Sequence, residues 1–268
     1  MKNFRPLILF AAFVLVIGLA CNALGGGSDT PSQPQQEPPV QVQPTDEPVQ
    51  APTEAPPEPT ETPAPEPTDE PAASMFFTEE FDSELTSDWT LFTVTGDTAA
   101  DPDKLTVEVE DGRLVWDFDS EFLYAYLFYE AFEYEDVRLE VRADNLGRNN
   151  NNISLICRYD PDVGWYEFNI ANNGLYDIFF AEVASNGDIS YNFITDGGSN
   201  AIKQGRDVNE YAIECKGEQL TLYINGDEVN SIAERRFSLR RGQIGVSVSS
   251  FNVLPILIEM DWFKVLEP

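Results

Sequence analysis

Residues 209–229 read NEYAIECKGEQLTLYINGDEV. From Tyr211 to Cys215 every second residue is apolar, which is the period of a strand with one buried face. A second run of the same kind ends at Asn225 and Gly226, a pair that tolerates the positive φ angles of a two-residue hairpin loop. This stretch therefore predicts two paired antiparallel strands that bury one side.

The pattern extends over the chain from Phe76 onward, where short alternating runs are separated by turn residues and no apolar helical stripe exceeds two turns. Asp111 and Gly112 mark a second tight hairpin. A dozen strands do not stay in one flat open sheet, so two packed antiparallel layers are expected. The predicted strands are 105–110, 113–118, 122–129, 137–143, 152–159, 164–170, 175–183, 189–194, 210–216, 219–224, 242–249 and 255–265.

Three stretches resemble the concanavalin A-like lectin/glucanase superfamily, including laminin-G-like and 3-keto-disaccharide hydrolase-like domains. The hairpin at 209–229 is similar to their paired strands, GQIGV (242–246) with IEMDWFKV (258–265) to their final strands, and FDSELTSDW (81–89) to their opening segment. The resemblance implies an all-β, two-sheet antiparallel jelly-roll sandwich over 75–268. It implies fold more strongly than activity, because these motifs encode turns and packing.

The first 74 residues are expected to carry the domain rather than to join it. Residues 1–20 resemble a lipoprotein signal peptide: Lys2 and Arg5 precede an apolar run that ends at Cys21, the predicted lipidation site. Gly18 departs from the usual lipobox residue, and an uncleaved anchor helix or an ordinary secretory signal is the alternative. Residues 21–74 hold 14 of the 19 prolines and predict a disordered stalk. Each reading places the domain outside the cytoplasm, and the lipobox predicts a bacterial, membrane-anchored surface protein.

Charge and composition exclude several classes of function. The net charge of the chain is −31. From residue 75 onward there are 37 Asp and Glu residues and 14 Lys and Arg residues, which gives the domain a net charge of −23. Such a surface repels phosphate backbones and anionic lipids, so nucleic acid is not an expected partner and the membrane is expected only through the lipid anchor. The chain has no histidine, which removes Ser-His-Asp and Cys-His nucleophiles and His-ligated metals.

Two cysteines remain once Cys21 is assigned to acylation. Cys157 and Cys215 each lie on the apolar parity of a predicted strand, so both side chains are expected to point inward. An even number in an exported domain favours a disulfide over two buried thiols. Closing the 57 intervening residues stabilises by about 4 kcal/mol in the chain-entropy account.

Catalytic carboxylates are not evident. Laminarinase-type members of the superfamily carry E-x-D-x-x-E on one strand, because retaining hydrolysis needs an acid and a nucleophile close together. The nearest match is Glu259, Asp261 and then Lys264, where a cation stands at the acid/base position. Acid pairs elsewhere, such as Glu108 with Glu110, are expected in a chain this acidic and read as solvated charges.

A candidate carbohydrate-binding surface lies on the face opposite the core. Trp165, Glu167 and Asn169 alternate with the core residues of their strand, and Arg158 has the same outward parity on the neighbouring strand. An aromatic ring beside polar groups suits a sugar, whose apolar face stacks and whose hydroxyls form hydrogen bonds. The structural alternative is that Trp165 covers a sheet edge and Arg158 pairs with Glu167. The weaker aromatic candidates are Tyr191 and Tyr223.

A structural calcium ion is a further candidate, with Asp160, Asp162 and Asp261 as weak ligand candidates, but no D-x-D-x-D-G loop is present. No other cofactor is expected. The leading hypothesis is a monomeric, non-catalytic domain that binds glycan, such as a cell-wall or extracellular polysaccharide. A sugar-processing enzyme, 3-keto-disaccharide hydrolase-like or glycosidase-like, is the first alternative. A structural or protein-binding module is the second.

Overall fold

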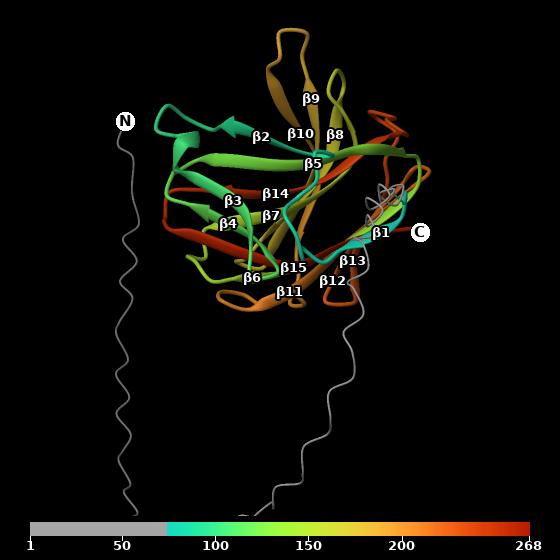
Figure 1. Ribbon diagram of the computed structural model, residues 1–268. Helices are drawn as coiled ribbons and strands as arrows, with labels where there is room; N and C mark the ends of the chain where they lie inside the picture. Colours follow the sequence, from blue (N-terminus) through green and yellow to red (C-terminus); the bar gives the residue numbers. More distant parts are fainter. Residues whose placement is uncertain (1–73) are drawn as a thin grey trace, which may run out of the picture. The chain divides into compact units, whose positions relative to one another are not determined.

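The computed structural model describes residues 74–268 (Figure 1). The predicted signal peptide (1–20), Cys21 and the predicted stalk (21–74) lie outside the described residues, except for Ser74. Within them every regular element is a β-strand apart from the short 3-10 turn η1 (Pro102–Lys104). No helix in this part of the chain is long and apolar enough to cross a membrane.

The strands form two antiparallel sheets, which confirms the predicted sandwich. The eight-stranded sheet contains β1 (Phe77–Glu79), β3 (Leu105–Glu110), β4 (Arg113–Phe118), β6 (Val137–Asn145), β11 (Val208–Lys216), β12 (Gln219–Ile224), β13 (Asp227–Ala233) and β15 (Ile256–Leu266). The seven-stranded sheet contains β2 (Trp89–Thr95), β5 (Leu123–Tyr134), β7 (Asn151–Asp160), β8 (Gly164–Ala171), β9 (Leu175–Val183), β10 (Ile189–Gly198) and β14 (Gly242–Ser250). Their orders are β13-β12-β11-β6-β15-β4-β3, with β1 on β15, and β10-β9-β8-β7-β14-β5-β2.

All twelve predicted strands are present, and three further strands, β1, β2 and β13, were missed. β2 and β13 are edge strands, and β1 pairs only with β15. Most residues of β2 and β13 are partly or fully exposed. An edge strand does not need a strict apolar alternation, so its sequence carries a weaker signal than that of a central strand.

The two predicted hairpin turns occur as expected. Asp111 and Gly112 have φ angles of 50° and 74°, and Asn225 and Gly226 have φ angles of 51° and 88°. Asp, Asn and Gly tolerate this left-handed region, which the two-residue loop requires at both central positions. These turns set the register of β3 with β4 and of β12 with β13.

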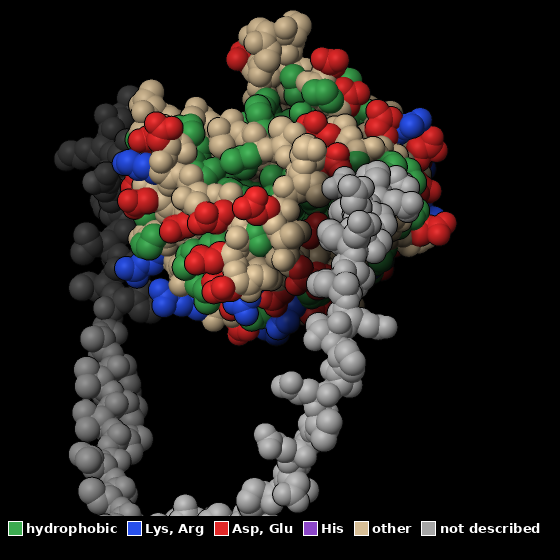
Figure 2. All heavy atoms as spheres, viewed as in Figure 1, with side chains coloured by type: hydrophobic (Ala, Val, Ile, Leu, Met, Phe, Trp, Pro, Cys, Tyr) green, Lys and Arg blue, Asp and Glu red, His purple; other side chains and the backbone are tan. Residues whose placement is uncertain are grey.

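The core lies between the sheets and is built from alternate residues of each strand. On β7 and β8 these are Ile153, Leu155, Cys157, Tyr166, Phe168 and Ile170, all essentially inaccessible to solvent. The opposing layer comes from strands such as β6, β11 and β15. Outside, Asp and Glu outnumber Lys and Arg, and Figure 2 shows acidic side chains across the visible face. Repulsion among these surface charges is offset by the large apolar area buried within.

The predicted disulfide is present and crosses this core. It joins Cys157 on β7 of the seven-stranded sheet to Cys215 on β11 of the eight-stranded sheet. Both cysteines are fully buried. The covalent bond therefore holds the two layers together from inside the apolar core.

Replacement of both cysteines by alanine should lower the free energy of unfolding by about 4 kcal/mol, because the unfolded chain loses a long covalent loop. Urea denaturation of the oxidised protein and of the double variant measures this. A reductant should destabilise the parent protein and leave the double variant unchanged. Equal denaturation midpoints for all four samples would contradict the role assigned to the bond.

Candidate functional site

A second apolar cluster lies on the outer face of the seven-stranded sheet, on the side away from the core. It consists of Tyr126, Phe128, Ile156, Trp165 and Ala181, all of which are buried. They belong to β5, β7, β8 and β9, whose alternate residues point into the sandwich core. One sheet thus packs apolar side chains on both faces, which is unusual for an antiparallel sheet with one face toward solvent.

Trp165 lies on this outer face, as its parity predicts, but it is not an exposed platform. Its side chain is only 1% accessible. Edge-on rings of Tyr126, Phe128 and Tyr159 surround it at centroid distances of 5.4, 5.7 and 5.7 Å. The expectation of an outward stacking surface at Trp165 is therefore wrong, since neighbouring aromatic rings cover it. The alternative that it covers a sheet edge is also wrong, because β8 is an interior strand.

Glu167 is the buried carboxylate at the centre of the outer face, with a residue accessibility of 2%. One oxygen accepts hydrogen bonds from Trp165 Nε1 at 3.1 Å and Tyr126 Oη at 3.3 Å. The other accepts from Ser154 Oγ at 3.0 Å and Asn169 Nδ2 at 3.5 Å. Burial raises the pKa of Glu167, and these four hydrogen bonds offset only part of the rise.

A chain of hydroxyls connects Glu167 to β10 at the sheet edge. The hydroxyl oxygens of Tyr126 and Tyr191 are 2.6 Å apart, and Tyr126 in turn donates to Glu167. Burial raises the pKa of both phenols, so they stay protonated at neutral pH. Tyr191, a weaker candidate from sequence, therefore joins the same site as Glu167.

The outer face is hollowed into a pocket of about 520 Å³. β2 and β10 are the two edge strands of the seven-stranded sheet, yet both contribute to the pocket lining, so the sheet curves strongly (Figure 1). The pocket is lined by Val94, Thr95, Gly96, Tyr124, Tyr126, Asn152, Glu167, Asn169, Asp177, Phe179, Ile189, Tyr191, Ser249 and Phe251. Aromatic rings and oxygen acceptors dominate this lining, and none of these residues is Lys or Arg.

Asn169, also predicted from sequence, lines the pocket beside Glu167. Its amide nitrogen contacts Glu167, while its Oδ1 is buried and has no hydrogen-bond partner among the described residues. Asp177 stands directly opposite Asn169 on the neighbouring strand β9. Because directly opposed residues share a face, Asn169 and Asp177 lie side by side in the pocket wall.

Arg158 does not belong to this site, contrary to the sequence prediction. A register shift between Cys157 and Asp160 interrupts the β7–β8 pairing, and Arg158 itself has a φ of 57°. The irregularity turns its side chain into the protein, where it is 1% accessible. Simple alternation cannot predict the direction of a side chain at a bulge. The alternative pairing of Arg158 with Glu167 is not observed either.

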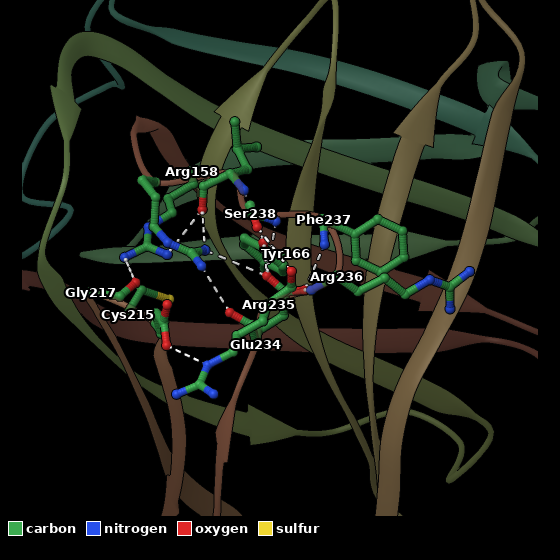
Figure 3. Close-up of polar contacts among 12 residues, drawn as sticks. Arg158, Tyr166, Cys215, Gly217, Glu234, Arg235, Arg236, Phe237 and Ser238 are labelled. Atoms are coloured by element: carbon green, nitrogen blue, oxygen red, sulfur yellow. Dashed lines mark hydrogen bonds and ion pairs between the residues drawn. The ribbon is translucent and has the colours of Figure 1, made fainter.

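The guanidinium of Arg158 instead binds three backbone carbonyls (Figure 3). It donates to the oxygens of Glu135 at 3.0 and 3.2 Å, Leu239 at 3.1 Å and Gly217 at 2.9 Å. These carbonyls belong to loops distant in sequence. Arg158 therefore ties three loops together next to Cys157, with a structural role.

Glu234 holds the adjacent loop, which connects β13 to β14 (Figure 3). It accepts a hydrogen bond from Tyr166 Oη and is 3.5 Å from Arg240 in an ion pair. Burial alone would raise the pKa of Glu234, but these bonds and those from the amides of residues 236–238 outweigh it and lower the pKa. These contacts stabilise the charged form of the Glu234 carboxyl group. Glu234 therefore has a structural role.

The calcium candidates do not come together in one site. Asp160 and Asp162 lie in the β7–β8 turn, where Asp160 accepts from the Asp162 amide at 2.9 Å. Asp261 lies on β15 in the other sheet and is 3.2 Å from Arg113 and 3.0 Å from Arg142. Within residues 74–268 no group of three or more Asp, Glu, Cys or His side chains is placed to hold a metal. The three aspartates thus do not fit a shared calcium site.

The remaining sequence candidates lie outside the pocket as well. Tyr223 on β12 of the other sheet packs under Arg138, whose guanidinium carbon is 4.5 Å from the ring centre. Glu259, the first acid of the broken glucanase motif, pairs with Arg113. Neither residue contacts Glu167 or the pocket around it.

Several pocket residues were missed by the sequence analysis, namely Tyr124, Tyr126, Asn152, Asp177, Phe179 and Phe251. Most have the outward parity of their predicted strands, as Trp165 and Glu167 do. A search of the predicted central strands for polar or aromatic outward residues would have found all of them except Phe251, which lies beyond the predicted strand 242–249. The order of the strands was needed to know that they lie side by side.

The comparisons with known proteins indicate the same fold as the structure. The profile of the 3-keto-alpha-glucoside-1,2-lyase-like domain matches residues 77–253, about two thirds of the chain. The chain belongs to this family. The match covers most of the described sandwich and includes the whole seven-stranded sheet. It confirms the resemblance seen in the hairpin at 209–229. No curated protein sequence matches the chain.

Solved structures share the concanavalin A-like fold at low identity. A β-glucanase from Bacillus licheniformis is 14% identical with a TM-score of 0.50, over 72% of this chain and 98% of the glucanase. A glycoside hydrolase family 16 endo-glucanase from Bacteroides ovatus is 11% identical with a TM-score of 0.50, over 71% of this chain and 99% of the enzyme. At such identities the likeness concerns the fold alone.

Arg158→Ala should lower the free energy of unfolding by roughly 3–5 kcal/mol, because three carbonyls lose a buried charged donor. Arg235→Ala is the matched control: this arginine is 75% exposed and pairs with Glu218 on the surface. It should change stability by less than about 0.5 kcal/mol. Urea denaturation of both variants compares them, and equal small effects would show that the Arg158 contacts carry little free energy.

Glu167 should make stability fall as the pH rises. Its pKa is higher in the folded than in the unfolded protein, so the folded state binds more protons between the two pKa values. Urea denaturation from about pH 4 to about pH 7 should show the parent protein losing stability relative to Glu167→Gln. Glu108→Gln, an exposed acid on β3, controls for loss of a surface charge. A pH-independent difference between parent and Glu167→Gln would refute the raised pKa.

Proposed function

We propose that the domain binds carbohydrate in the pocket on the outer face of the seven-stranded sheet. The observation that carries this proposal is the pocket itself, in which the rings of Tyr124, Phe179, Tyr191 and Phe251 stand around amide and carboxyl oxygens. Its volume of about 520 Å³ is within the usual range for small-ligand sites. A sugar offers apolar ring faces to aromatic side chains and hydroxyl donors to oxygen acceptors.

Family membership and fold support the same reading. The family name refers to a glucoside, and the structural neighbours named above are glucanases. A purely structural module would show a filled sheet face, whereas this face is hollow. A concave pocket of this size suits a small or chain-like ligand better than the surface of a folded protein.

The setting we propose is the outside of a bacterial cell. The signal-like residues 1–20, with Cys21 as the acylated residue, support a lipid anchor, and the proline-rich stretch up to residue 74 supports a spacer. The ligand in this setting is a cell-wall or extracellular polysaccharide or a fragment of one. The domain acts as a monomer, with the lipid as its membrane contact.

A sugar-processing activity is the second candidate, favoured by the lyase in the family name and by Glu167 in the pocket wall. Elimination next to a ketone needs a base near the acidic carbon, and a carboxylate of raised pKa suits proton transfer. Its four hydrogen bonds oppose this role, because they occupy the oxygens that would receive the proton. Binding without catalysis therefore remains our preferred function.

Tyr124→Ala and Tyr191→Ala should each weaken glycan binding at least tenfold, about 1.4 kcal/mol, because each removes a ring from the pocket. A glycan array identifies a bound oligosaccharide, and titration calorimetry gives its affinity. Tyr223→Ala, which removes a ring from the other sheet, is the control and should bind like the parent. Unchanged glycan affinity in both pocket variants, or the absence of any bound glycan on the array, would exclude this pocket as a glycan site.

The enzyme candidate has its own test. Incubation with a 3-keto-glucoside, followed by chromatography, should show no product beyond that of a buffer control if the domain only binds. Product formation that disappears in Glu167→Gln would instead establish Glu167 as a catalytic residue and replace the non-catalytic reading.

A further inference from the structure

Three polar residues form a row across the pocket side of adjacent strands. Asn169 on β8 pairs with Asp177 on β9, and Asp177 pairs with Asp196 on β10. Directly opposed residues point to the same face with their Cβ atoms roughly 5 Å apart. Asn169 and Asp177 line the pocket, and Asp196, which is exposed, lies beside Asp177 on the edge strand β10.

This row consists of acceptors that lack donors. The buried Oδ1 of Asn169 has no partner, and the side chains of Asp177 and Asp196 make no hydrogen bond or ion pair within residues 74–268. Two carboxylates directly opposite each other repel and destabilise the strand pair. A buried amide oxygen without a donor also carries a desolvation cost. The repulsion between the carboxylates would fall if a positively charged donor occupied the row.

We propose that this row binds the protonated amino group of an amino sugar. The proposal rests on the carbohydrate function assigned to the same pocket and specifies the ligand class. An ammonium group carries one positive charge and three N–H donors, so it can bond the carboxylate of Asp177 together with other acceptor oxygens of the pocket. Asp196 adds attraction from the neighbouring strand.

An ammonium group fits the row better than the other occupants. A neutral diol would satisfy hydrogen bonds but would leave the two carboxylates repelling each other. A metal ion would need more hard ligands than the described residues gather, since among them no three Asp, Glu, Cys or His side chains are placed to hold a metal. An acidic sugar would meet two carboxylates in a pocket without Lys or Arg, on a domain of net charge −23.

The direction of the pKa shift of Asp177 agrees with this assignment. Burial, together with the nearby charge of Asp196, raises the pKa of Asp177 when the pocket is empty. A bound cation would favour the charged form and lower that pKa again. Binding should therefore release protons below neutral pH, and titration calorimetry in buffers of different ionisation enthalpy would detect that release.

The decisive experiment compares three β-1,4-linked trisaccharides of matched length on the full protein by titration calorimetry. These are the trimers of glucosamine, N-acetylglucosamine and glucose. The glucosamine trimer should bind at least tenfold more tightly than the other two at low salt. The advantage should shrink as sodium chloride screens the charges.

Asp177→Asn tests the residue itself. It should abolish most of the preference for the glucosamine trimer and retain binding of the neutral trimers, because only the charge is removed. Glu228→Gln, which removes an exposed acid from β13 of the other sheet, is the control for general attraction of a cation to an acidic protein. The Glu228→Gln variant should prefer the glucosamine trimer as strongly as the parent protein does. Asp196→Asn should also weaken the preference and raise the free energy of unfolding, since the opposed pair is removed.

The outcomes separate this proposal from the carbohydrate function. Equal affinities for the three trimers overturn the amino-sugar assignment and leave glycan binding standing. A preference that Asp177→Asn and Glu228→Gln reduce alike shows attraction to net charge only, and also overturns it. Failure of all three trimers to bind overturns the amino-sugar assignment, while the glycan array decides the carbohydrate function.

Discussion

The burial of the Glu167 carboxylate is the constraint on which the outer face depends. A charged group removed from water is costly unless hydrogen bonds replace its hydration, and four donors surround Glu167. These donors come from β5, β7 and β8, so the strands must keep their register to hold them. The raised pKa shows that the replacement is incomplete. The outer face therefore carries a buried polar site, which a shell of aromatic side chains surrounds. It is not an extension of the apolar core.

The seven-stranded sheet can support this shell because its other face is fixed by an independent core. Cys157 and the alternate residues of β7 and β8 pack against the eight-stranded sheet, and the disulfide adds a covalent tie. Arg158 and Glu234 then fix the loops beside that tie through buried polar contacts. The interior strands that carry Glu167 and Asn169 are thus bounded by rigid packing. Tyr191 and Phe193, by contrast, lie on the edge strand β10, and both residues are exposed.

The sequence was sufficient to predict the fold and the sheet face of most residues of the central strands. It was insufficient to predict how deeply each side chain is buried. Alternation placed Trp165, Glu167 and Asn169 on the correct side, because it depends only on the local period of the strand. It could not reveal that Trp165 is covered, since the covering rings come from β5 and the end of β7. It placed Arg158 wrongly because a bulge breaks the period. The pocket itself depends on curvature that brings β2 and β10 together, and no local pattern encodes the strand order that makes this possible.

The distribution of charge distinguishes the outer faces of the two sheets. The eight-stranded sheet uses its cations on its own outer face, where Arg113 and Arg142 pair with Asp261, and Arg138 pairs with Glu140. In these ion pairs the charged groups on that face already satisfy one another. They therefore have little need of a ligand. On the opposite side the residues lining the pocket include no Lys or Arg, so its acceptors remain unbalanced. The aromatic pocket on the seven-stranded sheet thus holds acceptors without cationic partners, and a bound donor there would lower the free energy by meeting them.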